Sequence, residues 1–203
     1  LKIMLYLLLK PKKGDVVVDC GAYVGRLAIM AAKSVGNMGK VIAIEPHPST
    51  FRLLVFNLLM NGVIDRVMPL NIALTDKEGF AKLQLNNVPP RYSIVKTVGR
   101  KYLNVPTRRL DKLARELKIK LIHWLTIDVE GAEELVLKGA QNLLRRHQIK
   151  NLVIEIHSKE NLKRTLKILI RNSYECRVYQ KHASCYIWAY PKNLMLKHVI
   201  RKD

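Results

Sequence analysis

The chain has 203 residues, 49% of them hydrophobic, which predicts about one domain with a full core. Its three cysteines lack CxxC spacing, and this excludes a disulfide framework and a cysteine zinc site. No apolar run reaches membrane-spanning length, and the apolar start of the chain has no cleavage pattern, so neither a membrane span nor a signal peptide is expected. We therefore expect a cytoplasmic protein with free thiols.

The formal net charge of +20 is unevenly distributed. Lys and Arg number seven against six Asp and Glu in residues 15–90, ten against two in residues 91–120, and fifteen against eight in residues 121–203. One interpretation is a lysine-rich solvated surface, as in heat-adapted proteins. The other is a face that binds a polyanion such as RNA through the 91–120 segment and the C-terminal half.

The first half of the chain alternates helical and strand-like patterns. Ile3–Leu9 is predicted as a short helix covering one end of a sheet, within an N-terminal segment of about residues 1–10. The following elements are a buried strand in Asp15–Cys20, a helix from Arg26, a strand in Val41–Pro48, an amphipathic helix in Ser49–Asn61 with Phe51, Leu54, Val55, Leu58 and Leu59 inward, and a third strand in Val67–Leu74.

The second half continues the alternation after a break. Phe80–Leu85 is predicted as an exposed strand, and residues 86–106 as a basic irregular insert. Later elements are a helix in Arg108–Leu117, strands in His123–Val129 and Asn151–His157, one helix between those strands with Ala132, Leu135, Val136, Leu143 and Leu144 inward, a helix with Leu162, Leu166, Leu169 and Ile170 inward, and an antiparallel pair in Tyr174–Gln180 and Cys185–Tyr190. This order predicts a single α/β domain over residues 1–203, with a mostly parallel seven-stranded sheet, an antiparallel edge hairpin and helices on both faces.

A glycine turn follows the first predicted strand, in the pattern D-x-G-x-x-x-G formed by Asp19, Gly21 and Gly25. A strand, a glycine turn and a helix cradle nucleotides in doubly wound folds. A dinucleotide fingerprint needs G-x-G-x-x-G, but Tyr23 occupies the place of the middle glycine and would crowd a pyrophosphate. A nicotinamide dehydrogenase is therefore disfavoured, and an ordinary structural turn stays as an alternative.

The second predicted strand ends in Glu45, 26 positions after Asp19. An acid at this place in doubly wound folds accepts hydrogen bonds from ribose hydroxyls. Pro46 or His47 could pack on an adenine face, and Asn71–Ala73 are placed where adenine would pair with backbone. The alternative role for Glu45 is that of a carboxylate at a helix start.

Four polar side chains come from the ends of the next two parallel strands. Asp128 and Glu130 follow one strand, whereas Glu155 and His157 end the other. Ligands of open α/β sheets bind outside these carboxyl ends.

The segments DCGAYVG (19–25), EPHP (45–48), IDVEGAE (127–133), LKGA (137–140) and IEIH (154–157) resemble the FkbM-type methyltransferases over roughly residues 9–191. The resemblance implies a Rossmann-like class I methyltransferase fold, S-adenosylmethionine as methyl donor, and oxygen as the usual acceptor. The glycine turn then looks like methyltransferase motif I. The implied cofactor-binding residues are Asp19, Gly21, Ala22, Tyr23, Gly25, Glu45, Pro46, Asn71, Ala73 and Asp128.

Transfer to a hydroxyl needs a base or a metal ion to remove the proton. His157 is the first candidate for the base, and Asp128 or Glu130 would orient the acceptor or the amino group of the donor. Glu130 could instead cap the following helix, and His157 could be a structural strand-end histidine. Asp128, Glu130 and His157 could also bind a divalent metal ion, but no metal is favoured.

The methyl acceptor is left open between two classes. The resemblance favours a small hydroxylated compound or a sugar. The charge favours RNA, for example a ribose 2′-hydroxyl, because Arg91, Tyr92 and Tyr102 belong to basic stretches with interleaved aromatics. The sequence also lacks the N-P-P-Y signature of base-directed amino methyltransferases, which favours oxygen. A non-catalytic assembly factor that binds S-adenosylmethionine or RNA is the alternative function.

Overall fold

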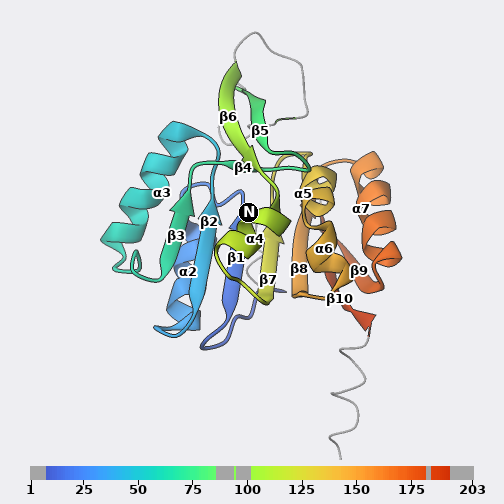
Figure 1. The fold of residues 1–203 in the computed structure, drawn as a ribbon, viewed down its shortest axis with the longest axis horizontal. Coiled ribbons are helices and arrows are strands. Elements are labelled where there is room, and N and C mark those ends of the chain that lie inside the picture. The colour runs from blue at the N-terminus through green and yellow to red at the C-terminus, as the bar shows by residue number, and fades with distance from the viewer. Residues whose placement is uncertain (1–7, 86–93, 95–101, 182–183, 193–203) are drawn as a thin grey trace, which may run out of the picture.

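A computed structural model describes residues 8–85, 94, 102–181 and 184–192 (Figure 1). The strands are β1 (Val16–Cys20), β2 (Lys40–Ile44), β3 (Val67–Leu70), β4 (Ala73–Leu74), β5 (Gly79–Gln84), β6 (Tyr102–Arg108), β7 (Ile122–Ile127), β8 (Ile149–Ile156), β9 (Tyr174–Lys181) and β10 (Ser184–Pro191). The helices are α2 (Arg26–Val35), α3 (Pro48–Met60), α4 (Leu110–Glu116), α5 (Glu133–Gly139), α6 (Gln141–Arg145) and α7 (Lys159–Arg171).

Seven strands form the central sheet in the order β3-β2-β1-β7-β8-β10-β9. The five strands from β3 to β8 pair in parallel, and β10 pairs antiparallel with both β8 and β9. The order reverses between β1 and β7, which creates the switch point where doubly wound sheets bind ligands. The predicted parallel sheet with an antiparallel edge pair is confirmed.

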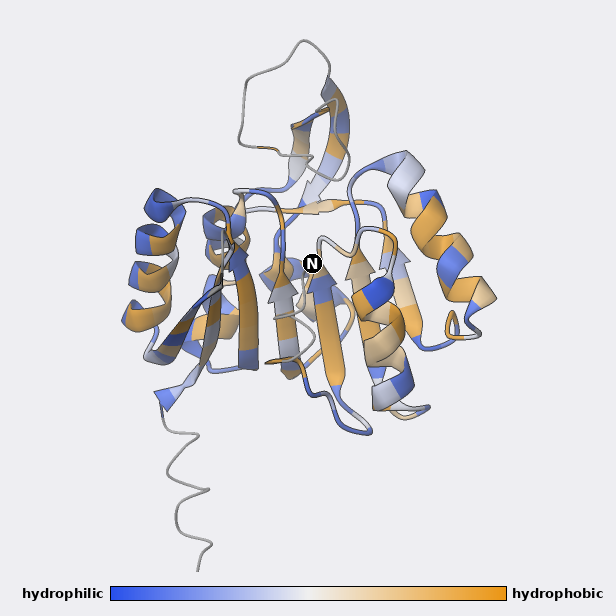
Figure 2. Cartoon of the chain, turned by 180° about the vertical axis from the view of Figure 1, so that it is seen from behind, coloured by the Kyte–Doolittle hydropathy of each residue, from blue (hydrophilic) through white to orange (hydrophobic). Residues whose placement is uncertain are grey.

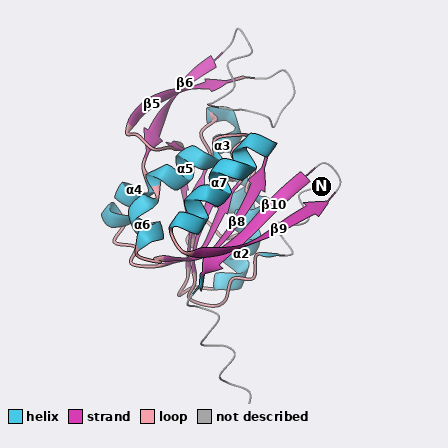
Figure 3. Cartoon of the chain, turned by 90° about the vertical axis from the view of Figure 1, so that its right-hand side faces the viewer, coloured by secondary structure: helices cyan, strands magenta, loops and turns pink. Residues whose placement is uncertain are grey.

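Helices cover both faces of this sheet (Figure 3). Successive side chains along each strand point alternately to one face and the other. In β1, Val18 and Cys20 pack on the side of α4, α5, α6 and α7, whereas Val17 packs on the side of α2 and α3. The central strands therefore carry apolar residues on both faces and read as continuous hydrophobic runs, as the hydropathy colouring shows (Figure 2).

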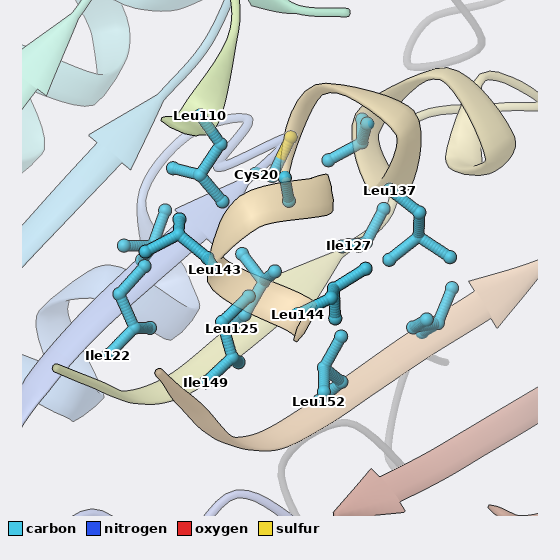
Figure 4. Packing of buried hydrophobic residues seen from close by; sticks show 14 of the residues in the cluster. Cys20, Leu110, Ile122, Leu125, Ile127, Leu137, Leu143, Leu144, Ile149 and Leu152 are labelled. Atoms are coloured by element: carbon cyan, nitrogen blue, oxygen red, sulfur yellow. The ribbon is translucent and has the colours of Figure 1, made fainter. Parts of the chain in front are cut away.

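The larger core cluster lies under the α4–α7 layer (Figure 4). Its members include Leu125 and Ile127 of β7, Leu137 of α5 and Leu144 of α6, all fully buried. The three cysteines are free, as the sequence predicted.

The predicted third strand is wrong in its second half. Only Val67–Leu70 joins the central sheet, because the chain bends at Asn71, whose amide donates to the carbonyls of Glu45 and Pro46 at 2.8 and 3.0 Å. The next residues form β4, which belongs to a separate three-stranded sheet in the order β4-β6-β5. This small sheet stands above the carboxyl edge of the central one (Figure 1).

The irregular insert predicted for residues 86–106 is wrong at its C-terminal end, because Tyr102–Arg108 forms β6 and pairs with β5 over six residues. Pro106 lies in this strand, where it pairs with Phe80. A proline argues against a strand in the sequence, so the strand was not predicted. Apart from Ile94, residues 86–101 lie outside the described part of the chain, as does most of the predicted helix Ile3–Leu9.

Two helices bury less than their periodicity predicts. α3 lies over the edge strands and buries Leu54 and Leu58, but Leu59 is 56% exposed. In α7, Ile170 is exposed because the helix faces the sheet with only one side. The single helix predicted around Ala132–Leu144 is two helices that meet at Ala140. No helix in the described part of the chain is long and apolar enough to cross a membrane.

Gly139, in the LKGA segment, allows two backbones to touch. A Cβ at this position would lie 2.0 Å from the carbonyl oxygen of Thr75, the residue after β4. Glycine is required here because the small sheet rests directly on the end of α5.

We expect Gly139→Ala to lower the free energy of unfolding by about 1–3 kcal/mol, because the added methyl must push two backbones apart. Urea unfolding followed by circular dichroism measures this. Lys138→Ala, one residue earlier on the exposed side of α5, is the control and should cost about 0.5 kcal/mol. Equal effects of the two substitutions would contradict the close contact.

Candidate active site

A pocket opens at the switch point, at the carboxyl ends of β1, β2 and β7, and encloses about 610 Å³ of space including its mouth. The small sheet covers one side of it. The lining residues are Cys20, Gly21, Tyr23, Ile44, Glu45, Pro46, Ile72, Ala73, Leu74, Leu83, Ile94, Asp128, Val129 and Ala132. Its lining is mostly apolar, with Glu45 and Asp128 among its few polar groups, which is the usual character of a small-ligand site.

The turn after β1 forms the floor of the pocket because Gly21 has no side chain. Its φ is +87°, and a Cβ would lie 2.0 Å from the carbonyl oxygen of Asp128. The amide of Asp128 donates to the carbonyl of Cys20 at 2.9 Å. The ends of β1 and β7 are thereby fixed against each other at the base of the pocket.

Glu45 is 6% exposed, and its two oxygens accept hydrogen bonds from the turn and the next loop. The amide of Tyr23 donates to one oxygen at 3.0 Å, and the amide of His47 donates to the other at 2.9 Å. Burial raises the pKa of Glu45 to about 7, against the lowering effect of these hydrogen bonds. Each carboxylate oxygen has a second lone pair, so the ribose role predicted for Glu45 is compatible with this geometry.

Five of the predicted cofactor residues besides Glu45 line the pocket: Gly21, Tyr23, Pro46, Ala73 and Asp128. The other four predicted residues are not among the lining residues, and they are Asp19, Ala22, Gly25 and Asn71.

Each of these four has a structural contact that explains its position. Asp19 is buried in β1 and accepts a hydrogen bond from the Thr126 hydroxyl at 2.8 Å. A Cβ at Gly25 would lie 2.6 Å from the Leu54 side chain, so this glycine lets α3 pack close to the turn. The amide of Ala22 donates to the carbonyl of Ile44, and Asn71 holds the loop after β2 as described above.

His157, Asp128 and Glu130 come together beside this pocket. The Nε2 atom of His157 lies 3.4 Å from a carboxylate oxygen of Glu130 and 3.7 Å from one of Asp128. One ligand atom from each residue lies within 4.8 Å of the other two, so the three could hold a metal ion. The three residues named together as possible metal ligands therefore lie close to one another, and their roles stay predictions. Glu130 is not the N-cap residue of α5, which is Ala132.

Sequence reasoning missed Glu133, which is 0% exposed and lies directly behind His157. One oxygen of Glu133 lies 2.5 Å from His157 Nδ1 and accepts from the Gly131 amide at 3.0 Å, and its other oxygen accepts from the Asn161 amide group. The last residue of the IDVEGAE segment, six positions after a strand end, could have indicated this inward-facing acid.

The carboxylates control the protonation of His157. Burial lowers the pKa of His157, but the hydrogen bond to Glu133 and the charges of three neighbouring carboxylates raise it above its ordinary value. The Nδ1 atom of His157 contacts Glu133, and the Nε2 atom is directed toward Asp128 and Glu130.

The basic residues predicted to contact RNA are partly engaged within the protein. Arg108 pairs with Glu78 at 3.0 Å and with Glu116, and Arg109 pairs with Asp111. Tyr102 is 52% exposed, and the Lys82 ammonium lies over its ring. Arg91, Tyr92, Arg100, Lys101 and the side chains of Lys181 and His182 lie outside the described part of the chain.

A family model described as the methyltransferase FkbM domain matches residues 19–176. The hexuronic acid methyltransferase AglP of Haloferax volcanii is 27% identical over 164 residues, which cover 80% of this chain and 64% of AglP. Methyltransferase sdnD of Sordaria araneosa is 24% identical over 187 residues, covering 77% of this chain and 71% of sdnD. The chain thus spans slightly less than two thirds of AglP.

Solved structures share the fold. A methyltransferase FkbM from Methylobacillus flagellatus KT superposes with a TM-score of 0.64 at 18% identity, over 89% of this chain and 45% of that one. The Aeropyrum pernix fibrillarin, solved with bound S-adenosyl-L-methionine, gives a TM-score of 0.57 at 17% identity, over 93% and 74% of the two chains. At these identities the likeness shows a Rossmann-like methyltransferase fold.

We expect S-adenosylmethionine binding to weaken as the pH falls through about 7, because Glu45 then gains a proton and no longer accepts from ribose hydroxyls as a carboxylate. Isothermal titration calorimetry across this pH range measures the effect. Glu45→Gln should bind about tenfold more weakly at high pH and lose most of the pH dependence. The exposed Asp65→Asn is the control, and an unchanged pH profile in Glu45→Gln would contradict the assignment.

Proposed function

The chain belongs to the FkbM methyltransferase family, and we propose that it transfers a methyl group from S-adenosylmethionine to the oxygen of a hydroxyl group. One observation carries the proposal. Asp128 lines the pocket at the switch point and also lies 3.7 Å from His157 Nε2. A candidate ligand pocket and a candidate base are therefore neighbours, as methyl transfer requires.

The residues present fit the cofactor. Gly21 lets a ligand approach the backbone, Glu45 has free lone pairs for the ribose, and Pro46 with Ile72 offers apolar contact to the adenine. When bound, S-adenosylmethionine supplies an electrophilic methyl group on a positively charged sulfur. Asn71 stays a predicted contributor, because it holds the loop that carries Glu45 and Pro46.

His157 is the proposed base. Its Nε2 atom would take the proton of the acceptor hydroxyl, and the Nδ1–H group donates to Glu133, which stabilises the resulting imidazolium. Glu130 and Asp128 lie on the Nε2 side and would orient the hydroxyl. The proton thus passes from the acceptor oxygen to the ring nitrogen as the oxygen attacks.

The proposed acceptor is a hydroxyl of a sugar or small hydroxylated compound. AglP is named for methylation of a hexuronic acid, and a carboxylated sugar would suit a chain with a net charge of +20. RNA is the second candidate, favoured by the same charge and by the exposed Tyr102. The ion pairs of Arg108 and Arg109 within the protein weaken the RNA candidate.

Purified protein incubated with radiolabelled S-adenosylmethionine and separate pools of glycans and polar metabolites, total RNA and lipid should label the glycan and metabolite pool. Label in RNA that resists base hydrolysis as a 2′-O-methyl dinucleotide would favour the second candidate. Absence of label from all pools, with the cofactor still bound, would favour the non-catalytic assembly factor.

His157→Ala should reduce methyl transfer by about 10²- to 10⁴-fold. Cofactor affinity should stay within about twofold, because His157 is not among the residues that line the pocket at the switch point. Single-turnover transfer and calorimetry measure the two quantities. His147→Ala is a control for general loss of histidine, since its ring contacts Asn172 and Tyr174 away from the pocket. Full activity in His157→Ala would remove this residue from the chemistry.

A further inference from the structure

We propose that Asp128, Glu130 and His157 bind one divalent cation of the oxygen-preferring class, such as Mn²⁺ or Mg²⁺. The cation site itself depends only on the geometry of these side chains. Its part in the reaction rests on the function proposed above.

The distances between the three side chains match a shared cation better than a hydrogen-bonded ion pair. His157 Nε2 lies 3.4 Å from Glu130 and 3.7 Å from Asp128, whereas a charge-assisted hydrogen bond would bring nitrogen and oxygen to about 2.7–2.9 Å. Two ligands that share an ion at 2.0–2.3 Å lie roughly 3.0–3.6 Å apart in octahedral or tetrahedral geometry. These two separations are therefore close to those of ligands that share an ion, and all three ligand atoms lie within 4.8 Å of one another.

The opposite edge of the imidazole is built as the outer support of a metal-binding histidine. The Nδ1 atom of His157 contacts Glu133, which is fully buried and takes no part in the triad. Asn161 and the Gly131 amide fix the Glu133 carboxylate in turn. A histidine that binds a metal usually donates its second N–H group to such a carboxylate, which orients the ring and makes the other nitrogen a better ligand.

The donor set selects the class of cation. Two carboxylates and one imidazole suit Mn²⁺ or Mg²⁺, which accept carboxylate oxygens and keep water in the remaining positions. A structural zinc site would fill four positions with protein ligands, often cysteines. The three cysteines of this chain are not members of the triad, and Cys20, whose carbonyl accepts from the Asp128 amide, lines the cofactor pocket.

A cation in this position would lie next to Asp128 and hence beside the cofactor pocket. An acceptor hydroxyl that replaces one of its waters would have a lowered pKa, and its proton would leave to solvent. With the cation bound, His157 is a ligand, and the role of base given to it above applies to the metal-free protein. Enzymatic activity in the two states therefore tells the two mechanisms apart.

Titration of the metal-free chain with Mn²⁺, with free Mn²⁺ followed by electron paramagnetic resonance, tests the site without cofactor or acceptor. We expect one bound Mn²⁺ per chain, displaced by excess Mg²⁺. Glu130→Gln and Asp128→Asn should each weaken binding at least tenfold, and Asp65→Asn, an exposed acid far along the sequence, should leave it unchanged. Circular dichroism of each variant confirms folding, and Glu130→Gln carries the test if Asp128→Asn does not fold.

Glu133→Gln separates a metal site from a group of surface acids. It should weaken Mn²⁺ binding by about 10- to 100-fold although Glu133 is not a ligand. The cation site would be overturned if Glu130→Gln bound Mn²⁺ with the same affinity and stoichiometry as the unsubstituted chain, or if the unsubstituted chain bound none at millimolar Mn²⁺.

Methyl transfer after treatment with EDTA then separates this inference from the proposed function. Activity that EDTA abolishes and Mn²⁺ restores supports the cation as part of the reaction. Activity that is indifferent to EDTA overturns that role and leaves the hydroxyl methyltransferase standing with His157 as base. Mn²⁺ binding without methyl transfer to any pool supports the site and overturns the proposed function.

Discussion

The contact between the turn after β1 and the end of β7 is the constraint on which the site depends. Gly21 leaves no space between its Cα atom and the carbonyl of Asp128, and the amide of Asp128 is tied to Cys20. The backbone of Asp128 is therefore fixed from both of its peptide groups. Among the described residues, Asp128 lines the pocket at the switch point and also contacts His157.

Glu133 shows how the chain surrounds a fully buried carboxyl group with hydrogen-bonding partners. A fully buried carboxylate without donors would cost several kcal/mol. The Glu133 carboxylate contacts three groups from different segments, which are the Gly131 amide, the Asn161 side chain and the His157 ring. Because Asn161 also sits at the start of α7, the same carboxylate joins α5, α7 and the end of β8 around the histidine.

Much of the architecture could be predicted from the sequence because it depends on local patterns. Apolar runs that end in Asp19, Glu45 and Asp128 mark parallel strands buried on both faces, and their carboxyl ends share one edge of the sheet. The small sheet could not be predicted in the same way. β4 has only two residues, and β6 contains Pro106 and pairs with residues of β5 that lie 18 to 28 positions away, so no local period reveals the pairing.

The residues of the site likewise separate into those that local sequence patterns predict and those that only tertiary packing brings into place. Residues that a strand end or glycine turn places, such as Gly21, Glu45 and His157, were predicted, although their roles stay predictions. The packing partners were missed, since Glu133 and Leu83 reach the site only through the way α5 and the small sheet fold back. Asp19 and Gly25 were assigned to the cofactor and are not among the pocket-lining residues, and their assignment stays a prediction.

Gly139 brings the small sheet into contact with α5, the helix that begins at Glu133. The carbonyl of Thr75 touches the last turn of α5, and the first residue of α5 is Glu133, which holds His157. The strand just before Thr75 is β4, whose Ala73 and Leu74 line the cofactor pocket. One seven-residue helix, α5, therefore lies between the strand that lines the pocket and the carboxylate that contacts His157.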